Sequence, residues 1–225
     1  MNKSKIHAIE RQANNLVKNV CANAFSKSDI MRLHNVGSQA ARFFTTIKDH
    51  KDKVENKYPL RPIASCRNNP TEKLDWLLSK ILNQALKYIP SYIKNTDDLI
   101  SKLSSIDQCD TGKVFVSLDI KNLYSNIPIQ EGIEYISQFI ENHWDQLDTY
   151  GLTLDAVKKI LSFVSFNYEI EYNGKHHIQK KGCPMVTHYS PPFALIFISF
   201  TEQKAPNPWR ESFDLNPRIY ICQVH

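Results

Sequence analysis

Between Val114 and Asp119 the chain runs through an apolar segment interrupted only by Ser117, and the segment ends on a carboxylate. Such a run of valine, phenylalanine and leucine favours a buried β-strand. A carboxylate at the end of a buried strand is costly unless a cation or hydrogen-bond donors meet it. Two interpretations follow: Asp119 caps the next turn, or Asp119 holds a cation at the rim of a cleft that it shares with Tyr124.

The sequence from 119 to 128 reads Asp-Ile-Lys-Asn-Leu-Tyr-Ser-Asn-Ile-Pro. This string resembles motif A of reverse transcriptases and is most similar to that of the Penelope-like retroelements. The resemblance implies that Asp119 is a catalytic residue that binds Mg²⁺. It also implies that Tyr124 belongs to the nucleotide-binding site, as an aromatic gate against the sugar 2′-hydroxyl.

Two short strands are predicted at 43–47 and 60–65. Basic residues lie in the segment between the strands and on the second strand. Arginine binds planar anions with two parallel hydrogen bonds, so such a hairpin suits phosphate. The residues alone equally fit a solvated basic hairpin. The strings Ile-Lys-Asp-His-Lys and Pro-Leu-Arg-Pro-Ile resemble the fingers motifs of the same retroelement group. That resemblance implies that Arg61 contacts the incoming triphosphate, with Lys48 and Lys51 nearby.

A glycine-containing loop at 179–189 leads into an apolar helix predicted over 193–200. A plain loop-to-helix junction explains this pattern, because glycine permits close backbone approach and Ser-Pro starts helices well. The order of residues also resembles motif B of the family, which implies nucleotide-binding roles for Gln179, Gly182 and Met185. The further matches are Thr187, Ser190, Pro191 and Ala194, and the departures are Val186, His188 and Leu195.

The segment 217–221 resembles the strand that enters motif C, where the family has an Asp-Asp pair. Cys222, Gln223, Val224 and His225 stand there instead. Nucleotide addition uses two divalent ions about 3.5–4 Å apart, and Mg²⁺ prefers oxygen ligands over imidazole. The sequence therefore predicts a fragment of an RNA-directed DNA polymerase that is inactive alone. The alternative is a non-catalytic remnant that binds RNA or an RNA–DNA duplex, and a domain with no nucleic-acid role also stays open.

Apolar periodicity and turn residues predict the remaining elements. Asn173-Gly174 predicts a hairpin over 168–179, in which His176 and His177 point to opposite faces and are both expected at the surface. The expected helices cover residues 5–25, 29–41, 74–89, 97–100, 129–140 and 154–164, the last with Thr153 as its cap.

These elements predict an α+β fold. By resemblance it is the fingers and partial palm of a right-hand polymerase, with a ferredoxin-like palm sheet that includes the strands at 114 and 217, and with no thumb. The expected division is an N-terminal helical extension over 1–42, a fingers-like region over 43–112 and a partial palm over 113–225. By resemblance the partners are an RNA template, a DNA primer and deoxynucleoside triphosphates, and the cofactor is Mg²⁺.

Composition sets wider limits on the class of protein. Hydrophobic residues make up 42% of the 225 residues and charged residues make up 23%. Both fractions are ordinary for a globular protein. The net charge of +5 leans only modestly toward polyanions. No apolar run is long enough to span a bilayer, and the five scattered cysteines show no metal-ligand spacing. We expect an intracellular protein, nuclear or cytoplasmic, with reduced thiols and no membrane contact.

Overall fold

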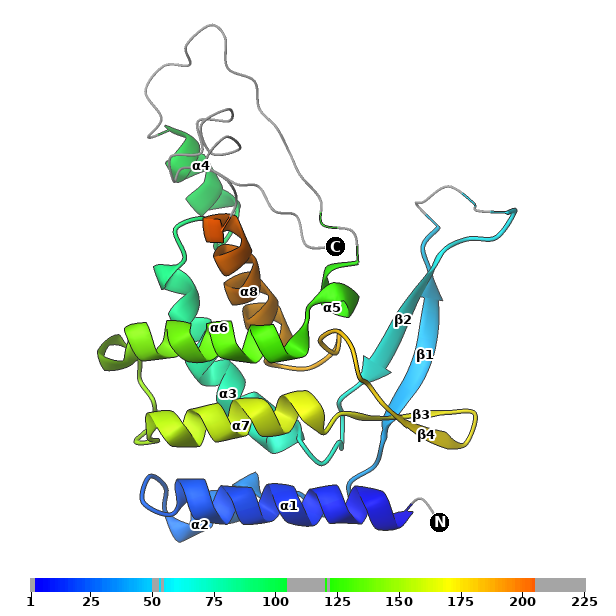
Figure 1. Cartoon of the computed structure of the whole chain (residues 1–225), viewed down its shortest axis with the longest axis vertical. Helices are drawn as coiled ribbons and strands as arrows, with labels where there is room; N and C mark the ends of the chain where they lie inside the picture. Colours follow the sequence, from blue (N-terminus) through cyan, green and yellow to red (C-terminus); the bar gives the residue numbers. More distant parts are fainter. Residues whose placement is uncertain (1–2, 50–52, 54, 105–119, 121, 205–225) are drawn as a thin grey trace, which may run out of the picture.

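The computed structural model describes residues 3–49, 53, 55–104, 120 and 122–204, and its overall arrangement is shown in Figure 1. It is an α+β structure, as the sequence predicts. The predicted strands at 114 and 217 lie outside the described residues, so the ferredoxin-like palm sheet stays a prediction. The helices are α1 (Lys3–Cys21), α2 (Lys27–Leu33), α3 (Glu72–Ala85), α4 (Thr96–Ser104), α5 (Leu123–Asn126), α6 (Ile129–Asn142), α7 (Leu154–Phe166) and α8 (Ser190–Lys204), with the 3₁₀ turns η1 (Leu86–Tyr88) and η2 (Trp144–Gln146).

The helices form one continuous hydrophobic core. α3 packs on α7 and α8, α6 packs on α7 and α8, and α1 covers α7 from the other side, with α2 beside α1 (Figure 1). Leu82, Ile136 and Val157 are fully buried in this core. The α6–α8 contact depends on Gly132, because a Cβ there would lie 2.6 Å from the ring of Phe193. This part of the fold follows from the apolar stripes that the sequence shows.

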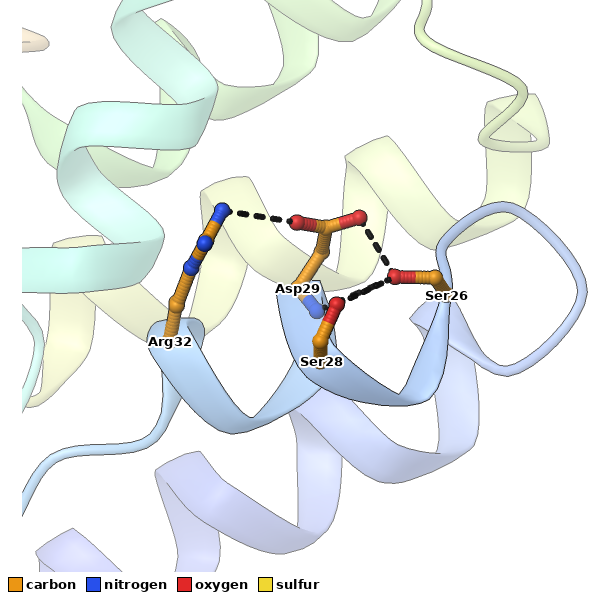
Figure 2. A network of polar contacts seen from close by, with 4 residues as sticks. All are labelled: Ser26, Ser28, Asp29 and Arg32. Carbon is orange, nitrogen blue, oxygen red and sulfur yellow. Dashed lines mark hydrogen bonds and ion pairs between the residues drawn. The ribbon is translucent and has the colours of Figure 1, made fainter.

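Side-chain caps set the starts of α7 and α2. At α7, Thr153 Oγ1 accepts a hydrogen bond from the Ala156 N–H (3.2 Å), so the predicted cap is confirmed. At α2, Ser26 Oγ accepts from the Asp29 N–H (3.2 Å) and donates to the Asp29 carboxylate (2.6 Å), as Figure 2 shows. Arg32 then pairs with Asp29 at 3.3 Å.

The predicted helix over 29–41 is therefore wrong in its extent: it begins at Lys27 and ends at Leu33. The residues after Leu33 are held by groups distant in sequence. The Asn35 N–H donates to Asn14 Oδ1 (2.8 Å), and the Ser38 N–H donates to the Glu10 carboxylate (2.6 Å). These bonds to α1 satisfy the backbone in place of helical bonds.

Within the described residues four strands form one mixed sheet in the order β2-β1-β3-β4. β1 (Ala41–Ile47) pairs antiparallel with β2 (Leu60–Ser65), and β3 (Glu169–Tyr172) pairs antiparallel with β4 (Lys175–Ile178). The β3–β4 turn has positive φ at Asn173 and Gly174, which confirms the predicted hairpin. β1 and β3 pair in parallel over only two residue pairs, so this short seam joins the two hairpins.

A small second core lies under the sheet. Ala41, Ala64, Cys66 and Tyr168 are buried together, with Phe43 and Ile170 packed partly against them. The Tyr168 hydroxyl donates to the Ala64 carbonyl at 2.7 Å, which ties the segment after α7 to β2. This cluster is separate from the helical core, so the sheet depends on few apolar contacts.

One surface prediction needs correction. His177 is exposed as expected, but His176 is partly buried, and its Nδ1 lies 3.2 Å from the carboxylate of Glu169. Glu169 itself is 1% exposed. Across the β3–β4 ladder His176 pairs with Glu171, so it shares a sheet face with Glu169, which is the physical reason for its position.

Candidate functional site

The loop between β4 and α8 carries Gln179, Gly182 and Met185, and it meets two other parts of the chain that the sequence singles out. In Figure 1 this loop lies between α5 and the β1–β2 hairpin. α5 lies inside the string that resembles motif A and carries Tyr124. The hairpin carries Lys48 and Arg61. The loop therefore connects the predicted motif A and fingers regions in space.

The contact with α5 is made through backbone atoms. Gly182 has φ +77°, and a Cβ at this position would lie 2.5 Å from Ser125 Cα and 2.6 Å from the Tyr124 carbonyl oxygen. The Cys183 N–H donates to that same carbonyl at 2.6 Å. Only glycine fits here without displacing backbone. Two segments that the sequence analysis treats as separate motifs thus touch at Gly182.

The loop conformation is held from within by Gln179. The Gln179 side-chain amide donates to the carbonyls of Lys181 (3.1 Å) and Gly182 (3.0 Å). The side-chain nitrogen of Gln179 therefore forms its hydrogen bonds within the loop. Met185 is half-buried. A nucleotide-binding role for these residues stays a prediction.

The contact with β2 is made at Val186, which stands where the family pattern has glycine. Val186 bridges Ser65 in parallel, and its carbonyl accepts from the Cys66 N–H at 3.3 Å. Among the described residues, the positive-φ positions do not include Val186, and its side chain is 42% exposed. The extended backbone at this position suits a β-branched residue.

A buried carboxylate, not singled out by the sequence analysis, supports the end of this loop. Asp75 in the first turn of α3 is 1% exposed, and its two oxygens accept the N–H groups of His188 (2.9 Å) and Tyr189 (2.7 Å). Burial raises the pKa of the Asp75 carboxyl to about 6, although both N–H donors act to lower it. One signal was present in the sequence: Asp75 falls within the apolar stripe of α3, beside Leu74 and Leu78.

Three polar side chains of the loop and of α8 are hydrogen-bonded to one another. Cys183 donates to Ser190, whose hydroxyl also contacts Thr187, and all three are buried. Burial raises the pKa of the Cys66 thiol to about 12, with the carboxylates of Asp75 and Glu72 adding to the shift. Burial likewise raises the pKa of Cys183 to about 12. Without a bound cation these thiols are therefore protonated at neutral pH.

Two basic residues of the hairpin, Lys48 and Arg61, share one face. In the β1–β2 register Arg61 pairs with Thr46, and the Lys48 N–H continues the ladder to the Pro59 carbonyl at 2.9 Å. Alternation along the strand puts Thr46 and Lys48 on the same side, so Lys48 and Arg61 lie on one face. Both side chains are half-buried. Their grouping is what a phosphate-binding surface needs.

Tyr124 is half-buried against the helical core, and burial raises the pKa of its phenol. Asp119 and Lys51 lie outside the described residues, so their positions relative to Tyr124, Lys48 and Arg61 stay predictions. The same holds for the predicted Mg²⁺ site and for Cys222 to His225. The structure thus brings together the loop, α5 and the hairpin.

Comparison with known proteins adds no assignment. No protein-family model matches the chain, and no curated protein matches it. Among the described residues, no helix combines the length and apolar character that crossing a membrane requires.

Proposed function

We propose that this chain supplies the template- and nucleotide-binding region of an RNA-directed DNA polymerase of the retroelement type. The observation that carries the proposal is the contact of the Gly182 loop with α5 on one side and with the end of β2 on the other. In a template-directed polymerase the residues that hold the new base pair and those that hold its phosphates act at one place. A site of this kind would require the Gly182 loop, α5 and the β1–β2 hairpin to lie in contact.

Charge supports the same proposal. Arg61 and Lys48 lie on one face of a hairpin whose loop also carries Lys53 and Lys57. Lys53 lies over the ring of Tyr58 with its Nζ 4.8 Å from the ring centroid. Basic and aromatic side chains on one exposed element are typical of surfaces that bind nucleic-acid backbone and bases. In this proposal Arg61 and Lys48 bind phosphate, and Tyr124 lines the sugar side of the nucleotide site.

The chemistry proposed for the whole site is nucleotidyl transfer with Mg²⁺. Asp119 would be one carboxylate ligand, and Mg²⁺ would balance the charge that develops on the phosphates. The residues of this chain would align primer, template and triphosphate. Binding of RNA or an RNA–DNA duplex without synthesis is the alternative, and it rests on the same hairpin and loop.

The proposal is tested by binding of a fluorescent RNA–DNA hybrid at several salt concentrations. We expect the Lys48→Ala/Arg61→Ala double variant to bind more weakly and to reduce the slope of log K against log[salt] by about 1–2, because two phosphate contacts are lost. The charge-matched control is Lys18→Ala/Lys159→Ala, which removes two exposed lysines from α1 and α7.

Equal salt slopes in the two double variants would contradict the proposal. Extension of a DNA primer on an RNA template with Mg²⁺ then separates synthesis from binding alone. If extension occurs, Asp119→Asn abolishes it while hybrid binding persists. Hybrid binding without extension by the unsubstituted chain is the expected result for a fragment that is inactive alone, and the binding alternative predicts the same result.

A further inference from the structure

Cys66, Asp75 and His188 meet at a point where three separate segments of the chain converge. Cys66 follows the end of β2, Asp75 is in the first turn of α3, and His188 is in the loop before α8. Their potential ligand atoms, a sulfur, a carboxylate oxygen and an imidazole nitrogen, all lie within 4.8 Å of one another. Cys66 and Asp75 are buried, and His188 is exposed.

We propose that Cys66, Asp75 and His188 form a binding site for a divalent transition-metal ion, and that Zn²⁺ is the ion that fits its ligands. Thiolate, imidazole and carboxylate are the three protein ligand types of Zn²⁺, whereas Mg²⁺ takes oxygen ligands. This inference does not rest on the proposed polymerase function. It concerns a different part of the chain from Asp119 and different metal chemistry.

The three ligand atoms lie near the spacing that a tetrahedral Zn²⁺ site needs. Zn²⁺ binds at about 2.0–2.3 Å from N, O and S ligands, which puts tetrahedral ligand atoms about 3.3–3.8 Å apart. The three groups therefore need to close by about 1 Å. His188 is exposed and can turn its ring to do so, while Asp75 is already fixed by two backbone N–H donors. Those donors orient the carboxylate, as outer hydrogen bonds do in known metal sites.

Electrostatics favour a cation at this point. The Cys66 sulfur lies near the carboxylates of both Asp75 and Glu72, and the imidazole of His188 is a basic side chain beside Asp75. A dication bound between them would offset the repulsion between the Cys66 thiolate and the Asp75 carboxylate. On binding, the metal–sulfur bond replaces the S–H bond of Cys66, and the proton leaves to the buffer. Three protein ligands leave the fourth tetrahedral position for water.

A metal here would fix the loop that carries Gly182. The Cys66 N–H already bonds to the Val186 carbonyl, and His188 is two residues further along that loop. An ion held by Cys66, Asp75 and His188 would add a second link from the loop to β2 and a direct link from the His188 side chain to α3. Loop order and metal binding would therefore be coupled.

The test is titration of the full-length protein with Co²⁺, which reports thiolate ligation by a near-ultraviolet charge-transfer band. Because Cys109 and Cys222 lie outside the described residues, the background protein carries Cys109→Ser and Cys222→Ser. We expect one Co²⁺ bound per chain, a thiolate band, displacement by Zn²⁺ and a higher Tm with Zn²⁺. Cys66→Ser should abolish the band, and His188→Gln should weaken affinity by about tenfold or more.

Matched controls make the result specific. Cys21→Ala removes another buried thiol, and His177→Gln removes another exposed imidazole, and both should leave the band and the affinity unchanged. His188 is exposed, so His188→Gln tests the proposal even if Cys66→Ser fails to fold. Absence of a thiolate band in the background protein, or unchanged affinity in His188→Gln, would overturn the proposal and leave Asp75 as a cap for the loop alone.

Discussion

The helical core and the four-stranded sheet differ in how many buried apolar side chains support them. The helices share a large core of fully buried side chains that spans α1, α3, α6, α7 and α8. The sheet rests on a cluster of Ala41, Ala64, Cys66 and Tyr168, and much of β1 and β2 is exposed. The basic residues that we propose for phosphate binding lie on the sheet. Stability and the proposed binding function are thus concentrated in different regions, as expected where binding elements sit on a rigid support.

The largest effect should come from the helical core. Leu82→Ala removes a fully buried side chain of α3. We expect a loss of about 2–5 kcal/mol in the free energy of unfolding because of lost burial and a cavity. The contrasting residue is Ile47 in β1, which is 62% exposed. Ile47→Ala should change the free energy of unfolding by less than about 0.5 kcal/mol. Urea denaturation followed by circular dichroism measures both, and equal losses would remove the contrast between the two regions.

The contact between the loop and α5 should give the next largest effect. In Gly182→Ala the new Cβ meets the backbone of Ser125 at a positive φ. We expect a loss of about 2–4 kcal/mol in the free energy of unfolding from clash and strain. Gly174→Ala is the matched control, since its φ is +69° and no atom lies within 4 Å of the added Cβ.

Gly174→Ala should therefore cost only about 1 kcal/mol of backbone strain. The difference between the two variants, measured by denaturant titration, isolates the close approach of loop and α5. A cost at Gly182 no larger than that at Gly174 would show that the loop is not pressed against α5.

The smallest stability effect concerns the link between the two regions. Tyr168→Phe removes the hydrogen bond to the Ala64 carbonyl. We expect a loss of about 1–2 kcal/mol in the free energy of unfolding because a buried acceptor is left unpaired. Tyr150→Phe on an exposed tyrosine is the control, with a change near zero. Amide hydrogen exchange in β2 should quicken in Tyr168→Phe alone. Unaltered exchange there would mean that the hydrogen bonds between the strands hold β2 in place, rather than the bond from Tyr168.

Local sequence patterns account for most of the helices and for both hairpins. Each of these signals involves residues that are close together in the sequence, so the sequence alone predicts the element. They are the apolar stripes of α3, α6 and α7, the Thr153 cap and the Asn173-Gly174 turn. The end of α2 was missed because the residues that follow it bond to Asn14 and Glu10 in another helix.

The candidate site is harder to predict for the same reason. Asp75 is separated from its donors His188 and Tyr189 by 113 and 114 residues, so no local pattern links them. The parallel pairing of Ala41 with Ile170 is also invisible in the sequence, since only two residue pairs define it. The sequence did predict a close backbone approach at Gly182, because glycine has no Cβ. Its role against α5 required coordinates.

The seam between β1 and β3 has a consequence for biosynthesis. β1 is made more than a hundred residues before its parallel neighbour β3. At the usual ribosomal pace of roughly 5–20 residues per second, the first hairpin would wait on the order of ten seconds for that partner. During this interval the edge of β1 at Ala41 and Arg42 offers unpaired amides and carbonyls to any passing strand. A chaperone that shields nascent chains should therefore raise the yield of soluble protein, and it should do so by acting before residue 170 is translated.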